Sequence, residues 1–127
     1  MNAPTTEALA VLDRLGRARV LVVGDVMLDR FVYGTVDRIS PEGPIGILRV
    51  RREMAVPGGA GNVVRNLAAW GVRATLVSVV GADAAGAELR QLLAREPALR
   101  VVMLRDRNRE TTIKTRYIAG AQQLLRA

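Results

Sequence analysis

Three short stretches of the sequence are almost continuously apolar. They cover residues 19–23, 74–80 and 99–104. An apolar run of this length, bounded by glycine, proline or polar residues, is typical of a strand buried on both faces, as in a parallel sheet covered by helices. The sequence therefore predicts a main sheet built from these three strands.

Helical periodicity separates these runs. The pattern predicts a leading helix over about 5–15 and a second helix over about 57–71, which Gly71 closes. A third helix begins at Asp83, a residue type that caps helices well, and stops before Pro97. Buried strands that alternate with helices favour a doubly wound α/β fold.

Apolar and polar residues alternate over about 29–36, 46–53 and 112–117. Alternation is the pattern of a strand with one face in water, and such strands belong to a thinner sheet than the buried ones. A turn at 119–121 and a strand over 122–126 would complete a hairpin with the last of them. We therefore expect a small lid of β-strands beside the main sheet.

Composition removes several classes of function. The chain has no cysteine and no histidine, which excludes disulfides, thiolate metal sites and a serine–histidine–aspartate mechanism. Its net charge is +7, but all of its 19 basic residues except Lys114 are arginines, scattered along the chain. The few aromatic residues do not alternate with basic ones as a base-stacking surface requires. We expect no nucleic-acid partner, no membrane span and no secretory signal, hence a cytoplasmic protein.

The segment 58–62, Gly-Gly-Ala-Gly-Asn, is the first candidate for chemistry. Glycines let the backbone approach a ligand closely, and the Asn62 amide offers a donor and an acceptor that match a sugar hydroxyl. Taken alone, a glycine pair before a helix is more often only a turn. The segment is not a Walker phosphate loop, because no Gly-Lys-Ser/Thr follows it.

Acidic and basic candidates lie near the predicted lid. Asp25 and Asp29 follow the first apolar strand, and a carboxylate can accept two hydroxyl hydrogen bonds at once. The simpler alternative is a solvated acid in a loop. Lys114 and Arg116 share one face of a predicted strand, which is either an ordinary solvated face or a phosphate site.

The spacing of glycines resembles the first signature of the ribokinase-type (PfkB) carbohydrate kinases. The residues in register with that signature are Gly58, Gly59, Ala60, Asn62, Gly71 and Gly81, and Val64 departs from it. The stretches 23–29 and 81–86 agree with the same family. The resemblance implies a ribokinase-like, doubly wound, mainly parallel α/β sheet with a small β lid.

The same resemblance assigns roles to the candidates. It implies that Asp29 is the sugar-binding carboxylate and that Gly58, Gly59 and Asn62 border the sugar. It makes Asp83 a helix cap without a chemical role.

Within the family, the chain is similar to the heptose 7-phosphate kinases, which phosphorylate C1 of the sugar on the route to ADP-heptose and lipopolysaccharide. The similar stretches are 24–30, 38–42, 57–59, 114–116 and 122–126; Gly43 and Gly46 depart from the usual residues. This similarity implies that Lys114, Arg116 and Arg126 bind the phosphate already on the substrate. It also implies ATP and Mg²⁺ as cofactors of the full-length enzyme.

The resemblance covers roughly the first two fifths of the family's kinase domain. We therefore predict that residues 1–127 are an N-terminal fragment with core segments 17–28 and 54–110 and lid strands over about 29–53 and 111–127. The family's catalytic Gly-Ala-Gly-Asp segment is not in this sequence. We assign no catalytic, cofactor or metal residue, and we expect the chain alone neither to bind ATP tightly nor to turn over.

Three functions stay open on the sequence alone. The first is the sugar-binding part of a heptose-phosphate kinase or of another PfkB-type kinase. The second is a catalytically inactive sugar-binding or regulatory module. The third is a small basic nucleic-acid binder. A homodimer joined through the lid strands is a further expectation. The kinase interpretation requires Asp29 and the 58–62 turn to meet at the carboxyl ends of neighbouring parallel strands, with the basic ribbon as a roof.

Overall fold

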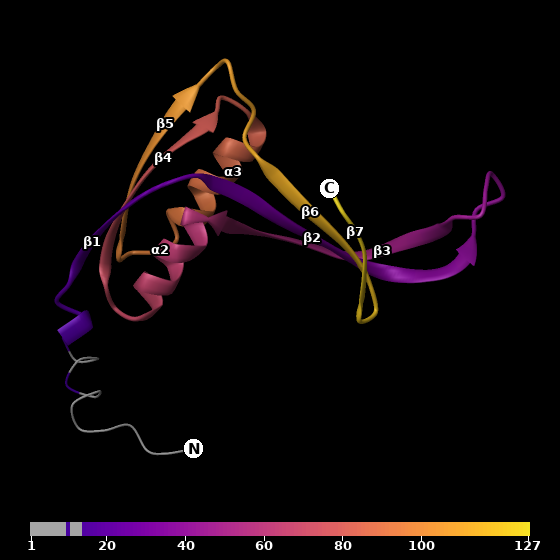
Figure 1. Cartoon of the computed structure of the whole chain (residues 1–127), viewed down its shortest axis with the longest axis horizontal. Coiled ribbons are helices and arrows are strands. Elements are labelled where there is room, and N and C mark those ends of the chain that lie inside the picture. The colour runs from indigo at the N-terminus through magenta and orange to yellow at the C-terminus, as the bar shows by residue number, and fades with distance from the viewer. Residues whose placement is uncertain (1–9, 11–13) are drawn as a thin grey trace.

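Two sheets, joined where the first strand ends, make up the fold (Figure 1). The computed structural model describes residue 10 and residues 14–127, so the predicted leading helix over 5–15 lies almost entirely outside the described residues. The main sheet has three parallel strands in the order β1-β4-β5. Their bounds are β1 (Arg19–Val23), β4 (Arg73–Gly81) and β5 (Leu99–Asp106).

The second sheet is the predicted lid, and it extends away from the main sheet (Figure 1). Its four strands lie in the order β3-β2-β6-β7. They are β2 (Val26–Ile39), β3 (Gly46–Gly59), β6 (Ile113–Ala119) and β7 (Gln122–Arg126). The predicted hairpin of β6 and β7 is confirmed, and Gly120 turns it with a φ of 58°.

Two lid strands are longer than predicted, and one strand pairing was not predicted at all. β2 and β3 are 14 residues long each, so both run beyond the alternating stretches. β6 pairs with β2 in parallel, although β2 and β3 are antiparallel. The pairing of β2 with β6 joins segments far apart in the sequence, and no local sequence pattern predicts it.

Both described helices, α2 (Ala60–Ala69) and α3 (Ala84–Leu93), pack on one face of the main sheet. The alternate residues of β4 that point to the helices are buried. The core also takes in the start of β2 and the inner faces of the helices. Its members include Val26, Leu28, Val64, Leu76, Val80, Leu89 and Leu93. The predicted α/β class with a β lid is confirmed.

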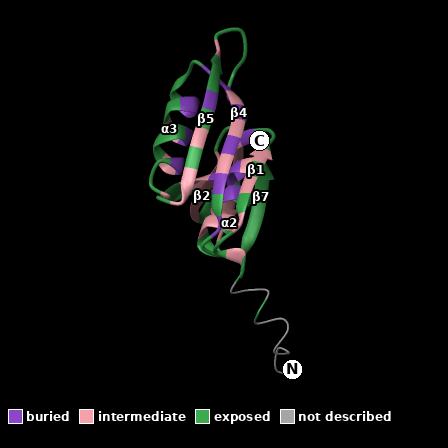
Figure 2. Ribbon diagram, turned by 90° about the vertical axis from the view of Figure 1, so that its left-hand side faces the viewer, coloured by how far each residue is buried: buried purple, intermediate pink, exposed green. Residues whose placement is uncertain are grey.

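The prediction that strands 19–23 and 99–104 are buried on both faces is wrong. Leu21 and Val23 are 64% and 71% exposed, and Leu104 on β5 is 58% exposed. Figure 2 shows exposed and half-buried segments along β1 and β5. The reason is that α2 and α3 contact the opposite face of the sheet, and no other described element covers this one. The outer face of the main sheet is therefore open in the described part of the chain, and it exposes large apolar side chains.

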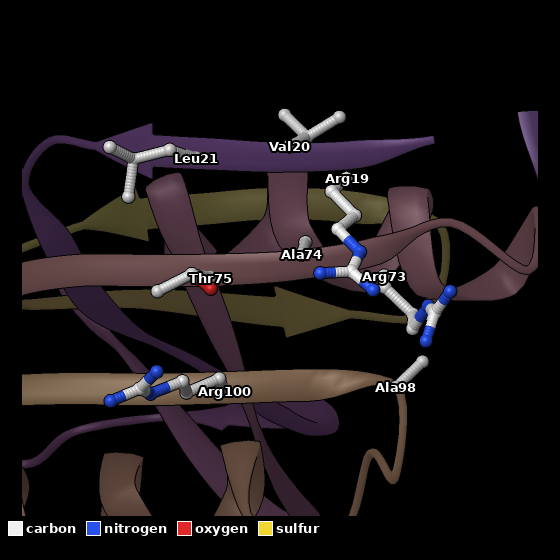
Figure 3. A pocket seen from close by; sticks show the side chains of 8 residues that line it. All are labelled: Arg19, Val20, Leu21, Arg73, Ala74, Thr75, Ala98 and Arg100. Carbon is white, nitrogen blue, oxygen red and sulfur yellow. The ribbon is translucent and has the colours of Figure 1, made fainter. Parts of the chain in front are cut away.

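Three arginines lie in the first residues of the main strands. Arg19, Arg73 and Arg100 line a shallow hollow together with Leu21 and Thr75 (Figure 3). In open α/β sheets, ligands bind outside the carboxyl ends of the strands. The arginine hollow lies at the opposite ends, so it is not the candidate sugar site.

The joint between the two sheets brings the end of β3 back to the start of β2. The buried Ser78 hydroxyl of β4 accepts a hydrogen bond from the Val26 amide at 3.2 Å. Gly59 has a φ of 58°, and the next amide, that of Ala60, donates to the Asp25 carbonyl at 2.9 Å. Because glycine adopts this backbone more readily than other residues, Gly59 suits the turn from β3 into α2.

Candidate functional site

Asp29 and Gly58 lie together in the lid. They are on neighbouring antiparallel strands, with Met27 opposite Gly58 and Asp29 opposite Val56. A Cβ atom at residue 58 would collide with the Asp29 carboxylate. Glycine at this position therefore allows the acid to lie directly against the backbone of β3.

Of the 58–62 turn that was expected to meet the acid, only Gly58 lies against Asp29, and the arrangement differs from the expected one. Asp29 does not follow the end of a main strand. It lies within β2, because the chain passes from β1 into the lid after only Gly24 and Asp25. The acid and its partners are neighbours within one sheet, so the basic ribbon lies beside Asp29 rather than above it as a roof.

Two cations of β6 converge on this acid. The Lys114 Nζ lies 2.8 Å and the Arg116 Nη1 lies 3.3 Å from Oδ1 of Asp29. The side chains of the three residues are 27%, 21% and 14% exposed, respectively. The parallel register places Lys114 opposite Asp29. Partial burial strengthens their electrostatic interaction relative to a pair at the open surface.

Arg126 adds a third cation. It lies on β7 directly opposite Arg116, and facing residues of antiparallel strands project from the same side of the sheet. Three cations and one carboxylate leave this cluster with two net positive charges. We call Asp29, Lys114, Arg116 and Arg126 the charged cluster.

The two other predicted residues lie apart from these contacts. Gly59 approaches the Asp25 carbonyl, so its place is explained by the turn. Asn62 is exposed in the first turn of α2, and its side chain makes no hydrogen bond to another described residue. The structure therefore brings Asp29, Gly58, Lys114 and Arg116 together, and gives no side-chain contact that joins Arg126 or Asn62 to them.

Sequence reasoning missed the apolar neighbours of the cluster. The Arg116 guanidinium lies over the Phe31 ring, 4.8 Å from its centroid. The Lys114 Nζ lies 3.6 Å from the Met27 sulfur. Met27 and Phe31 flank Asp29 at a spacing of two along β2, which puts all three on one face. The sequence alternation could have shown that Met27 and Phe31 share a face with Asp29. The pairing of β2 with β6, which brings the cations to that face, could not be predicted from the sequence.

Asp83 lies outside the charged cluster and caps α3, as predicted. Its Oδ1 accepts a hydrogen bond from the Gly86 amide at 2.8 Å. Hydrogen bonds from the Thr111 amide and then the Gly86 amide hold the pKa of Asp83 below its ordinary value. The Thr111 contact was not anticipated.

No three potential metal ligands among histidine, cysteine, aspartate and glutamate gather anywhere in residues 14–127 or at residue 10. Over the same residues, no helix is both long enough and apolar enough to cross a bilayer.

The fold is the ribokinase-like fold of carbohydrate kinases. Residues 17–126 match the sequence pattern of the pfkB family of carbohydrate kinases, and the chain belongs to that family. Phosphofructokinase-2 from Escherichia coli is 29% identical, with a TM-score of 0.64 over 84% of this chain and 33% of that one. A carbohydrate kinase from Agrobacterium tumefaciens shares the fold with a TM-score of 0.64 at 20% identity. The predicted ribokinase-like class is confirmed.

Curated relatives are more similar in sequence. "Bifunctional protein HldE" of Caulobacter sp. (strain K31) is 57% identical over 122 residues, which are 95% of this chain and 25% of that protein. "D-beta-D-heptose 7-phosphate kinase" of Bordetella bronchiseptica is 51% identical over 114 residues, which are 90% of this chain and 36% of that protein. The chain therefore spans between about a quarter and about a third of these relatives.

Proposed function

We propose that this chain is the sugar-binding part of a cytoplasmic kinase that phosphorylates heptose 7-phosphate at C1 with ATP. The observation that carries the proposal is the charged cluster, in which Lys114 and Arg116 meet Asp29. Its support from comparison is the similarity to a protein named for this substrate. The proposal combines a site for hydroxyl groups and a site for phosphate in one sheet.

The charge of the cluster suits a phosphorylated sugar. A phosphate monoester carries about −1.5 to −2 charges at neutral pH, and the cluster carries two net positive charges. Arg116 can donate two parallel hydrogen bonds to phosphate, whereas Lys114 acts as a point charge. Without substrate, Asp29 holds these two cations in place.

Asp29 has the complementary role of accepting hydrogen bonds from sugar hydroxyls. An ionised carboxylate offers two acceptor oxygens, and only one of them, Oδ1, is used by the cations. The second oxygen, Oδ2, faces the backbone at Gly58. A sugar lying against β3 would thus contact both the acid and the glycine.

ATP and Mg²⁺ would serve the complete kinase, in which they supply the phosphoryl group and neutralise its charge. The described residues contain no cluster of carboxylates suited to Mg²⁺, and we assign no nucleotide contact to them. We propose that this chain alone does not transfer phosphate. Sugar-dependent ATP consumption by the purified chain would contradict that proposal.

The Arg116→Glu variant tests the phosphate site. We expect its affinity for heptose 7-phosphate, measured by calorimetry, to fall about 10- to 100-fold, because a charge-assisted hydrogen bond is lost and a repulsive charge is added. The control is Arg100→Glu, which makes the same charge change in the remote arginine hollow (Figure 3). Equal affinities of the two variants would contradict the proposed function.

We also propose that two copies pair through their lids. Leu48, Tyr117, Leu124 and Leu125 line an apolar hollow on the lid, and Leu125 is 57% exposed. Covering such a hollow with the same surface of a second copy would remove apolar area from water. Sedimentation should give a dimer for the unmodified chain and a monomer for Leu125→Asp. A dimer in both cases would argue against lid pairing.

A further inference from the structure

Asp83 is bound by more groups than a helix cap requires. Besides the Gly86 amide of α3, it accepts hydrogen bonds from the Thr111 amide at Oδ2 and from the Thr111 hydroxyl at Oδ1, both at 2.7 Å. The hydroxyl oxygen in turn accepts a bond from the Gly81 amide at 2.9 Å. Thr111 is 94% buried, since its exposed fraction is only 6%. The loop before β6 is therefore held by the turn between β4 and α3.

Two glycines make room for this contact. A Cβ atom at Gly81 would lie 2.8 Å from the Thr111 amide nitrogen, and one at Gly86 would lie 3.0 Å from the Thr111 hydroxyl. The same Cβ atoms would also meet the turn itself, 2.5 Å from Asp83 Oδ2 for Gly81 and 2.6 Å from the Gly81 carbonyl oxygen for Gly86. Glycine at both positions thus lets the turn close tightly around Asp83 and Thr111.

The held residue leads directly into the strand that carries the cations. The carbonyl of Thr112, the next residue, accepts a hydrogen bond from the Leu28 amide of β2 at 2.9 Å. Ile113 then pairs with Leu28, and Lys114 pairs with Asp29. Only two residues, Thr112 and Ile113, separate Thr111 from Lys114, the first cation of the cluster.

We propose that Asp83 is a positioning residue that sets the register of β6 on β2 and so places Lys114 and Arg116 at Asp29. In a strand, a shift of one residue moves every side chain to the other face of the sheet. Such a shift would point both cations away from the acid. β6 has no tight turn to β2 that could set its register, because the two strands are parallel and distant in sequence.

Variants can separate this role from capping. Asp83→Asn keeps an oxygen that can cap α3, but it loses the second carboxylate oxygen that binds the Thr111 amide. Thr111→Val removes the hydroxyl and leaves the shape nearly unchanged. Thr111→Ser keeps the hydroxyl and is the conservative control.

A cysteine pair reports the register without relying on sugar binding. The chain has no cysteine of its own, and Arg30 and Thr115 face each other across β2 and β6. Neighbouring strands lie about 4.8 Å apart, which suits a disulfide between cysteines at these two positions. We expect rapid cross-linking with native Asp83 and Thr111 and with Thr111→Ser. With Asp83→Asn or Thr111→Val, cross-linking should be about tenfold slower, in line with the loss of a strong hydrogen bond.

Unchanged cross-linking in both disruptive variants would overturn the proposal. The consequence for ligand binding rests on the proposed function, so it is measured separately. Slow cross-linking with unchanged affinity for heptose 7-phosphate would uphold the register role and count against the phosphate site.

If the variants do not fold, amide hydrogen exchange of the unmodified chain tests the proposal instead. The Thr111 amide should then exchange together with the Leu28 amide, because both are protected by the same segment. If the Thr111 amide exchanges about a hundredfold faster than that of Leu28, the contact opens while the strand stays paired, and the proposal fails.

Discussion

Gly58 shows how a single missing side chain can define a site. A glycine within a strand usually weakens it, because it adds backbone freedom and no packing. Here the space above its Cα is occupied by the carboxylate of Asp29. The site therefore depends on a position that provides room rather than a functional group.

The Gly58→Ala variant should lose both stability and ligand binding. The added methyl group would displace the Asp29 carboxylate, at a cost of roughly 1–3 kcal/mol in the free energy of unfolding, as is usual for overpacking. Gly43→Ala is the matched control, since a Cβ at residue 43 meets nothing within 4 Å. Urea unfolding of the two variants measures the difference, and equal midpoints would contradict the close contact.

The contribution of Asp83 to stability should depend on pH. Its folded-state pKa is lowered from 3.8, first by the Thr111 amide and then by the Gly86 amide. A lowered pKa stabilises the fold above pH 3.8, and the effect is lost as the pH falls through the folded-state pKa. The difference in unfolding free energy between the native chain and Asp83→Asn should be constant near neutrality and shrink below pH 3.8. A difference that grows on acidification would contradict this assignment.

At the scale of elements, β2 contributes both to the hydrophobic core and to the charged cluster of the lid. Its first residues, such as Val26 and Leu28, are buried in the core, with exposures of 4% and 0%. Asp29 points to the opposite face, where the charged cluster lies. Because successive side chains of a strand alternate between faces, any shift of the core residues moves the acid as well.

Ser78 is the side chain that anchors β2 to the main sheet, and its loss should destabilise the chain. Ser78→Ala would leave the buried Val26 amide without its partner, which costs about 1–3 kcal/mol. Ser40→Ala removes a comparable bond, from the Glu42 amide, at an exposed site. Thermal unfolding should show a lower midpoint for Ser78→Ala alone. Similar midpoints for both variants would show that the anchor contributes little.

The whole molecule combines a packed interior with an open apolar surface. Parallel sheets are almost always covered on both faces, yet the outer face of this main sheet exposes Leu21, Val23 and Leu104. The relatives and neighbours are longer, and this chain spans 33% of phosphofructokinase-2. An exposed face of this kind is an association hazard for the chain on its own.

Polar substitution of the outer face should reduce association without unfolding the chain. Leu21→Thr combined with Leu104→Thr keeps strand-forming residues and lowers the apolar area. As the protein is concentrated, the double variant should scatter less light than the unmodified chain, while its unfolding midpoint stays the same. The control is Leu76→Thr on the buried face, which should unfold the chain. Unchanged scattering in the double variant would show that this face does not drive association.

Local patterns predicted the elements well and their environment less well. Glycine and apolar spacing gave α2, α3, the main strands and the final hairpin, because these signals are local. They did not predict the open outer face, because an apolar run such as 19–23 has the same pattern whether or not another layer packs on that face of the strand. They also gave no parallel pairing of β2 with β6, which depends on contacts between residues 87 positions apart.

The candidate site was predictable in its members but not in its arrangement. Asp29, Lys114 and Arg116 were named from alternation and family resemblance, and the structure joins them. Asn62 was named from the same resemblance and has no such contact. The Thr111 insertion at Asp83 has no sequence signal of its own, because it joins two loops 28 residues apart.

Determination of the structure of this chain with heptose 7-phosphate bound would test the central claim most directly. The account predicts phosphate oxygens within hydrogen-bond distance of Lys114 and Arg116, and a sugar hydroxyl on Asp29 beside Gly58. A sugar phosphate bound at the arginine hollow of the main sheet, with the ion pairs of Asp29 intact and untouched, would contradict it.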